Sequence, residues 1–263
     1  MASQFKGILY PARLPDFHRL PAGPEVAELV QWFWIPEWDI DPGRTSRQQL
    51  IAFPASNLVV EPGGVEFSGP TTRVAHRDLS GRSWAVGALL RPAAIPAFTA
   101  DPGSLRDTSL HPDAPELQAS VTAAMAGADP GERRQRAADA LAVWLAAAVG
   151  PVSAEARAAN RMVEVIGGSA EVLRIEDVAD VLATSPRTLQ RLARKYVGLS
   201  PSALIRRRRL QEAADRSRTE PLAELADIAA DLGYADHAHL CKDFQRYLGF
   251  TPSSYRRSVG GDR

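Results

Sequence analysis

The sequence predicts an α+β protein of two parts, rich in strands at the N-terminus and helical at the C-terminus. Short apolar or alternating runs, separated by clusters of Pro, Gly and Asp, fill residues 1–98. Over residues 153–258 apolar side chains recur instead at the three- and four-residue spacing of helices, and the whole pattern occurs twice. A chain of 263 residues is long enough for two cores. We therefore expect one domain over residues 1–150 and a second over residues 153–258, with Gly150 and Pro151 at the joint.

Composition excludes several classes of protein. With 45% hydrophobic and 24% charged residues, the chain is typical of a globular protein. Its formal charge is zero, although residues 1–150 carry 13 basic against 16 acidic side chains and residues 151–263 carry 18 against 15. The single cysteine excludes an internal disulfide and a metal site built from several thiolates. Neither a leader-like start nor an apolar run near the roughly 18 residues of a membrane span is present, so we expect a cytoplasmic protein without a metal or cofactor.

The N-terminal half contains four runs with the composition of strands, at residues 29–38, 50–53, 57–67 and 83–90. The segment "EPGG" interrupts the third run and predicts a hairpin turn there. Short strands at this spacing predict a small barrel or sandwich.

Tryptophans are concentrated in this half. Trp32 and Trp34 are two residues apart, so in a strand they share one face. Together with Trp84 they are either core side chains or the aromatic lining of a cavity that binds a small effector. The sequence leaves both interpretations open.

Between the strands and the C-terminal repeat, the pattern changes to helices. A short helical turn is expected within residues 91–100, followed by a loop rich in Pro, Asp and Ser. Residues 115–127 and 131–149 predict two helices, which either pack on the strands or form a dimer contact.

The C-terminal half contains an internal repeat, because residues 178–201 match residues 228–252. The matched pairs are Ala179 with Ala229, Leu182 with Leu232, Leu189 with Leu240, Tyr196 with Tyr247, Gly198 with Gly249, and Pro201 with Pro252. Each unit has the order helix, tight turn, helix, Gly and Pro, which is the order of a helix-turn-helix.

Capping residues locate the second helix of each unit. Ser185 is a good N-cap before Pro186, a residue that suits the first helical position. Asp236 takes the same capping role in the second unit. Gly198 and Gly249 are expected to end these two helices.

The face opposite the apolar stripe of each second helix is polar. On the first helix it carries Arg187, Thr188, Gln190, Arg191 and Arg194. On the second it carries His237, His239, Cys241, Lys242 and Gln245. Arg and Gln side chains match the edges of G and A in the major groove, and Arg, Lys and His also contact phosphates. The segment 202–217 between the units predicts a helix about 24 Å long, near the span that separates two reading helices on one duplex.

These motifs resemble the AraC/XylS family of bacterial transcription regulators. Each unit ends in G-x-[ST]-P, as "GLSP" (198–201) and "GFTP" (249–252), and the resemblance covers residues 153–258. It implies a promoter or operator in double-stranded DNA as partner, contact with RNA polymerase, and a homodimer. By position it also implies the base-reading residues, namely Arg187, Gln190 and Arg191 in the first helix and His237, His239 and Lys242 in the second, with Cys241 and Gln245 nearby.

Two residues depart from the pattern of the family. Ala193 stands where a bulky aromatic residue is usual, which predicts different packing of the first unit. Asp243 adds an acid beside Lys242, so the second helix is expected to be less cationic than the first. The N-terminal half is similar to the cupin-like sensor domains of such regulators, with "GALLRPAAIPAF" (87–98) like the sequence that closes their β-barrel, and this implies a small-molecule effector.

Other functions fit the residues less well. His237 and His239 lie about 200° apart around a helix and cannot chelate one ion together. Cys241 is the only cysteine, whereas an alkyl-accepting DNA-repair protein needs several around zinc. The four arginines at 206–209 span about 300° of a helix, so they cannot all contact DNA. No G-x-S-x-G, Gly-rich phosphate loop or paired-carboxylate motif predicts an enzyme, although an enzymatic or protein-binding N-terminal domain stays open as an alternative.

Overall fold

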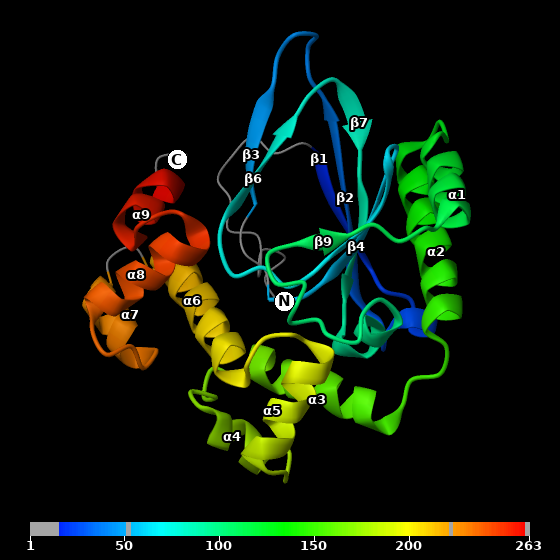
Figure 1. Ribbon diagram of the computed structural model, residues 1–263. Coiled ribbons are helices and arrows are strands. Elements are labelled where there is room, and N and C mark those ends of the chain that lie inside the picture. The colour runs from blue at the N-terminus through cyan, green and yellow to red at the C-terminus, as the bar shows by residue number, and fades with distance from the viewer. Residues whose placement is uncertain (1–15, 51–53, 221–222, 261–263) are drawn as a thin grey trace.

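The computed structural model describes residues 16–50, 54–220 and 223–260. Strands fill the first part of the chain and helices the second, so the α+β class predicted from the sequence is confirmed (Figure 1). None of the helices in these ranges combines the length and the apolar composition needed to cross a membrane.

An antiparallel sheet of seven strands forms the centre of the N-terminal part. Its order is β1-β2-β8-β4-β5-β9, and β7 pairs with β2 outside this path. The strands are β1 (Asp16–Pro21), β2 (Val30–Asp39), β4 (Asn57–Glu61), β5 (Gly64–Ser68), β7 (Arg82–Trp84), β8 (Val86–Leu90) and β9 (Ser109–Leu110). A separate two-stranded sheet joins β3 (Ser46–Leu50) to β6 (Ala75–Leu79). Residues 51–53 of the strand predicted at 50–53 lie outside the described residues.

Local sequence explains the strands well. In β2 the side chains of Phe33 and Ile35 are buried, whereas Trp32 and Trp34 alternate with them and face the other side of the sheet. The predicted "EPGG" turn is confirmed, because β4 and β5 pair up to Glu61 and Gly64 and leave two residues in the loop.

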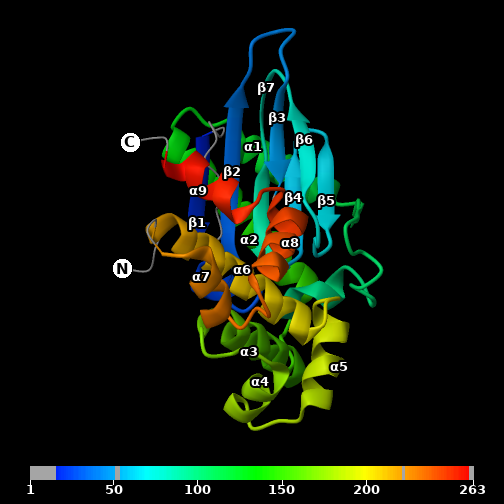
Figure 2. The same ribbon diagram turned by 90° about the vertical axis from the view of Figure 1, so that its left-hand side faces the viewer.

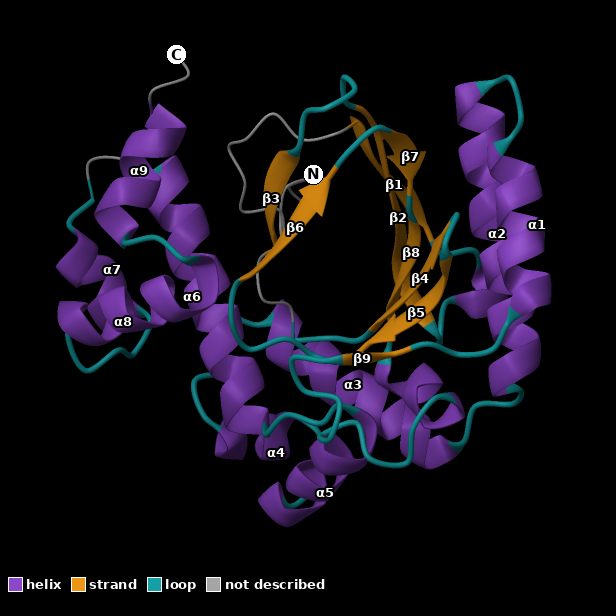
Figure 3. Ribbon diagram, turned by 45° about the horizontal axis from the view of Figure 1, so that its top comes forward, coloured by secondary structure: helices purple, strands orange, loops and turns teal. Residues whose placement is uncertain are grey.

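Two helices cover one face of the large sheet, and the small sheet lies toward the other face (Figure 3). These helices are α1 (Pro115–Met125) and α2 (Pro130–Val149), close to their predicted bounds. Asp129 caps α2, since its Oδ1 accepts a hydrogen bond from the backbone N–H of Glu132 at 2.7 Å. Short 3-10 turns, η1 (Pro24–Val26) and η2 (Pro92–Ala97), complete this part, and η2 is the helical turn expected within 91–100.

Seven helices follow in the described C-terminal part. They are α3 (Ala154–Gly168), α4 (Ile175–Val181), α5 (Pro186–Tyr196), α6 (Pro201–Thr219), α7 (Leu225–Asp231), α8 (His237–Leu248) and α9 (Pro252–Gly260). The pairs α4–α5 and α7–α8 are the two predicted helix-turn-helix units, and α6 connects them (Figures 1 and 2).

The two hydrophobic cores do not coincide with the N-terminal and C-terminal parts of the chain. One continuous cluster joins the large sheet, α1 to α5 and the first turns of α6, including Leu204 and Ile205. A second cluster joins the later turns of α6, including Leu210 and Ala214, to α7, α8 and α9. The first helix-turn-helix unit therefore shares a core with the N-terminal part, while the second has a core of its own.

Candidate nucleic-acid interface

Helix α5 is positioned by its cap and by its apolar stripe. Ser185 Oγ accepts a hydrogen bond from the backbone N–H of Thr188 at 3.1 Å, as expected for the N-cap. The buried side chains on the stripe are Leu189, Leu192, Ala193 and Tyr196. Ala193, the departure from the family pattern, is fully buried within this stripe.

The opposite face of α5 is open to solvent. Arg187, Gln190, Arg191 and Arg194 are exposed. Thr188 differs, because it is half-buried and its hydroxyl lies 3.0 Å from Ser185 Oγ, so it belongs to the cap of the helix. Four of the five residues predicted on this face are thus presented outward.

Glu155 of α3 contacts this face, and the sequence analysis did not find it. Its carboxylate forms ion pairs with Arg191 and Lys195 and accepts a hydrogen bond from the Tyr196 hydroxyl at 2.9 Å. Lys195, then Arg191 and Tyr196, lower the pKa of Glu155 to about 2. No local pattern reveals this contact, because 36 residues separate Glu155 from Arg191.

Helix α8 has the same construction. Asp236 Oδ1 accepts a hydrogen bond from the backbone N–H of His239 at 2.7 Å, and Gly249 ends the helix with φ of 75°. Among the predicted residues, His237, Lys242 and Gln245 are exposed.

Two residues of this face are only half-exposed. The ring of His239 meets the ring of Tyr234 edge-on, with centroids 5.3 Å apart. The Cys241 sulfur lies 3.4 Å from Nε2 of His237, and burial raises the pKa of the Cys241 thiol, which disfavours a reactive thiolate. Within the described ranges, no three His, Cys, Asp or Glu side chains are grouped as a metal site would require.

The predicted position of Asp243 beside Lys242 is wrong, while the expectation of a less cationic second helix stays a prediction. Asp243 is buried and points into the second unit, with its Oδ2 3.9 Å from Nε of Arg206. Consecutive residues of a helix are about 100° apart, so Asp243 shares the inner side with Leu240 and Tyr247 while Lys242 faces solvent. Its charge therefore does not lie beside Lys242 on the exposed face of α8.

Three of the four arginines at 206–209 pack within the fold. Only Arg206 is exposed. Arg207 lies over the ring of Tyr247 and Arg209 over the ring of Tyr234, with guanidinium-to-centroid distances of 5.7 and 4.4 Å. Arg208 is buried and donates to the carbonyl oxygen of Val172 at 2.7 Å. As predicted, the four side chains do not form a single surface toward DNA.

The first unit is joined to the N-terminal part at the end of α5. Gly198 has φ of 79°, and a Cβ there would lie 2.5 Å from the backbone of Pro102. Arg106, from the same loop, donates to the carbonyl oxygen of Gly198 at 3.1 Å. A loop of the N-terminal part therefore contacts the backbone just beyond α5.

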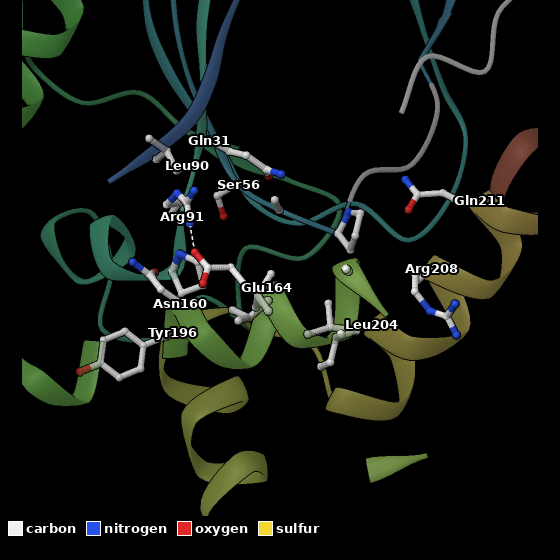
Figure 4. A pocket seen from close by; sticks show the side chains of 18 of the residues that line it. Gln31, Ser56, Leu90, Arg91, Asn160, Glu164, Tyr196, Leu204, Arg208 and Gln211 are labelled. Atoms are coloured by element: carbon white, nitrogen blue, oxygen red, sulfur yellow. Dashed lines mark hydrogen bonds and ion pairs between the residues drawn. The ribbon is translucent and has the colours of Figure 1, made fainter. Parts of the chain in front are cut away.

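Helix α3 carries further links. Buried Asn160 accepts a hydrogen bond from the backbone N–H of Ala93 at 3.0 Å and donates one to the carbonyl oxygen of Glu28 at 2.8 Å. One turn before it, Arg157 forms a bidentate pair with the carboxylate of Glu28. One turn after it, Glu164 pairs with Arg91 (Figure 4).

A cavity of about 440 Å³ lies where the large sheet, α3 and α6 meet (Figure 4). Side chains from all three segments line it, including Trp32, Leu90, Arg91, Asn160, Glu164 and Gln211. The cavity is therefore bounded by both parts of the chain.

The three tryptophans predicted to bind an effector do not come together there. Trp32 lines the cavity, but Trp34 and Trp84 are not part of its lining. Trp34 donates from Nε1 to Asn57 Oδ1 at 3.0 Å, and its ring lies where a Cβ of Gly87 would be. Trp84 is half-buried against the hydrophobic core.

The two parts of the chain match different families of known proteins. Residues 178–258 match the family model of a helix-turn-helix domain, and residues 18–111 match that of a domain of unknown function, DUF6597. The HTH-type transcriptional activator AarP of Providencia stuartii is 36% identical over 100 residues, which are 38% of this chain and 73% of AarP. An AraC-like transcription regulator of Streptomyces lividans is 34% identical over 123 residues, covering 47% of this chain and 38% of that protein.

Other matches cover less. An HTH-type transcriptional regulator of Haemophilus influenzae is 36% identical over 85 residues, so the chain spans only 28% of that relative. Among solved structures, ToxT of Vibrio cholerae gives a TM-score of 0.44 at 11% identity over 86% of this chain and 97% of ToxT. Because AarP is matched over most of its length, the chain belongs to the AraC/XylS family of transcription regulators.

Proposed function

We propose that the protein regulates transcription by inserting α5 and α8 into successive major grooves of one duplex. The observation that carries this proposal is the construction of the two helices, each with a cap, a buried stripe and an outward polar face. In this proposal residues 153–258 bind DNA and residues 1–150 sense a ligand or form a dimer.

Within α5, Arg187 and Gln190 are the best candidates for reading bases. Both are exposed, and among the described side chains neither has an ion-pair partner or a side-chain hydrogen bond. Arginine pairs with guanine and glutamine with adenine through two hydrogen bonds each. In α8, Lys242 and Gln245 are exposed, at the positions that match Arg191 and Arg194 of α5.

The experiment is selection of bound duplexes from a random pool, followed by binding of Arg187→Ala to the selected sequence. Loss of a base contact should weaken specific binding by about 1–3 kcal/mol and relax the preference at one base position. Arg161→Ala is the matched control, because Arg161 is an exposed arginine on α3, outside the helix-turn-helix unit. No enrichment with the wild-type protein, or equal effects of the two substitutions, would count against the proposal.

We also propose that a small effector binds the cavity between the sheet, α3 and α6. Its lining combines the indole of Trp32 and apolar side chains with the Arg91–Glu164 pair, which suits a molecule with an apolar body and a polar group. Because α3 lines the cavity and also contacts α5 through Glu155, occupancy could bias the position of the reading helix.

The test is a thermal-shift screen of the full chain against a metabolite panel. Val163 lines the cavity, so Val163→Trp should abolish any stabilisation that the wild-type protein shows. Val143→Trp is the control, since Val143 is 69% exposed on α2. Stabilisation that persists in Val163→Trp would refute this site, and turnover of a stabilising compound would favour an enzymatic N-terminal part instead.

A further inference from the structure

Glu155, the second residue of α3, contacts three side chains of the reading helix α5. It forms ion pairs with Arg191 Nη1 and Lys195 Nζ, and it accepts a hydrogen bond from the Tyr196 hydroxyl at 2.9 Å. Arg191 and Lys195 are one helical turn apart, so a single carboxylate reaches both. These contacts occupy one flank of the exposed face of α5.

Two features hold the Glu155 carboxylate in position. Tyr196 is only 3% exposed, so its hydroxyl ties Glu155 to the core of the first unit. Glu155 also lies in the first turn of α3, which Ser153 caps, and a negative charge is favoured at this end of a helix. Its pKa is lowered to about 2, so it is ionised at any pH used for DNA binding.

The two cations, in contrast, remain open to solvent. The side chains of Arg191 and Lys195 are 58% and 51% exposed. Without the carboxylate, each of these two charged groups would therefore be accessible to a DNA phosphate. For Arg187 and Arg194, on the other flank, no carboxylate partner occurs among the described residues.

We propose that Glu155 is a positioning residue that raises the specificity of DNA binding. It holds Arg191 through Nη1 and leaves the Nε and Nη2 donors for a base edge, because a guanidinium has five N–H donors. It also keeps Lys195 away from phosphates, which every sequence offers equally. This inference rests on the proposed function of α5.

The size of the effect follows from counterion release. One additional phosphate contact steepens the dependence of log K on log salt concentration by about 0.9. Release of Lys195 should therefore strengthen non-specific binding, and this gain should fall about twofold when the salt concentration rises from about 0.1 to 0.2 M. Specific binding should gain less, because Arg191 loses its fixed orientation.

The experiment compares the full-length wild-type protein with Glu155→Gln and Glu176→Gln. Glu176 is an exposed glutamate on the neighbouring helix α4 for which no ion pair occurs in the described part of the chain, so both variants lose the same charge. Anisotropy is measured on a random-sequence duplex of about 30 base pairs and on a duplex selected by the wild-type protein, from about 0.1 to 0.3 M salt. We expect tighter non-specific binding, a steeper salt dependence and a lower specificity ratio for Glu155→Gln alone.

Lys195→Ala supplies a second test that does not disturb Glu155. Because Lys195 is held away from phosphates, this change should leave the salt dependence near that of the wild type and cancel the gain of Glu155→Gln in the double variant. A lower salt dependence for Lys195→Ala, or equal behaviour of the two glutamine variants, would overturn the inference. A wild-type protein that binds no duplex would instead overturn the proposed function.

Discussion

Gly198→Ala tests whether the N-terminal part and the first helix-turn-helix unit form one cooperative structure. Alanine at a φ of 79° costs about 1–2 kcal/mol. Its Cβ would also lie 2.5 Å from the backbone of Pro102, so the loop must move and the hydrogen bond from Arg106 is lost, at about 0.5–1.5 kcal/mol. The expected total is about 1.5–3.5 kcal/mol. Gly233→Ala is the matched control. Gly233 also has a positive φ, of 68°, but a Cβ there would lie 3.6 Å from its nearest neighbour, Nη2 of Arg209.

Urea unfolding followed by tryptophan fluorescence distinguishes the two variants. All five tryptophans precede residue 151, so the signal reports the N-terminal part. Gly198→Ala should lower the midpoint by about 1 M urea, given a slope of about 2–3 kcal/mol per M. Gly233→Ala should leave it almost unchanged, because Gly233 lies in the second unit, which has a separate core. An unchanged midpoint for Gly198→Ala, or equal shifts for both variants, would refute the shared core.

Two further predictions concern α3. Asn160→Ala should lower the same urea midpoint, because the buried N–H of Ala93 and the carbonyl of Glu28 lose their hydrogen-bond partner, at a cost of about 1–3 kcal/mol. Arg161→Ala should leave the midpoint unchanged, because Arg161 is exposed. The pKa of Glu155 is lower in the folded protein than its ordinary value of 4.5. The ionised carboxylate therefore stabilises the fold above about pH 4.5, and this contribution is lost as the pH falls toward about 2. Glu155→Gln should therefore lose less stability than the wild type between about pH 5 and 3, and identical losses would contradict the ion pairs.

The features that the sequence predicted are those set by local chemistry. Ser185 and Asp236 cap α5 and α8 as expected, because a cap depends only on the next three residues. The turn between β4 and β5 was predicted for the same reason. The repeat located both units because each apolar stripe follows helical periodicity.

The features that it missed depend on contacts between distant segments. Glu155 meets Arg191 only because α3 packs against α5. Asp243 was predicted to lie beside Lys242 because the two residues are adjacent in sequence. Adjacent residues of a helix point to different sides, however, and Asp243 is buried. The same limit applies to the tryptophans. The two-residue period of a strand predicts that Trp32 and Trp34 share one face, but it does not predict which segments of the chain that face contacts.

The most direct test of the reading helices is a footprint on a duplex that the wild-type protein has selected. Chemical protection mapping should find two groups of protected bases on one side of the duplex, about 10 base pairs apart. Arg187→Ala should weaken one group and Lys242→Ala the other, since the two residues lie on different helices. A single protected group, or loss of the same bases in both variants, would contradict the account.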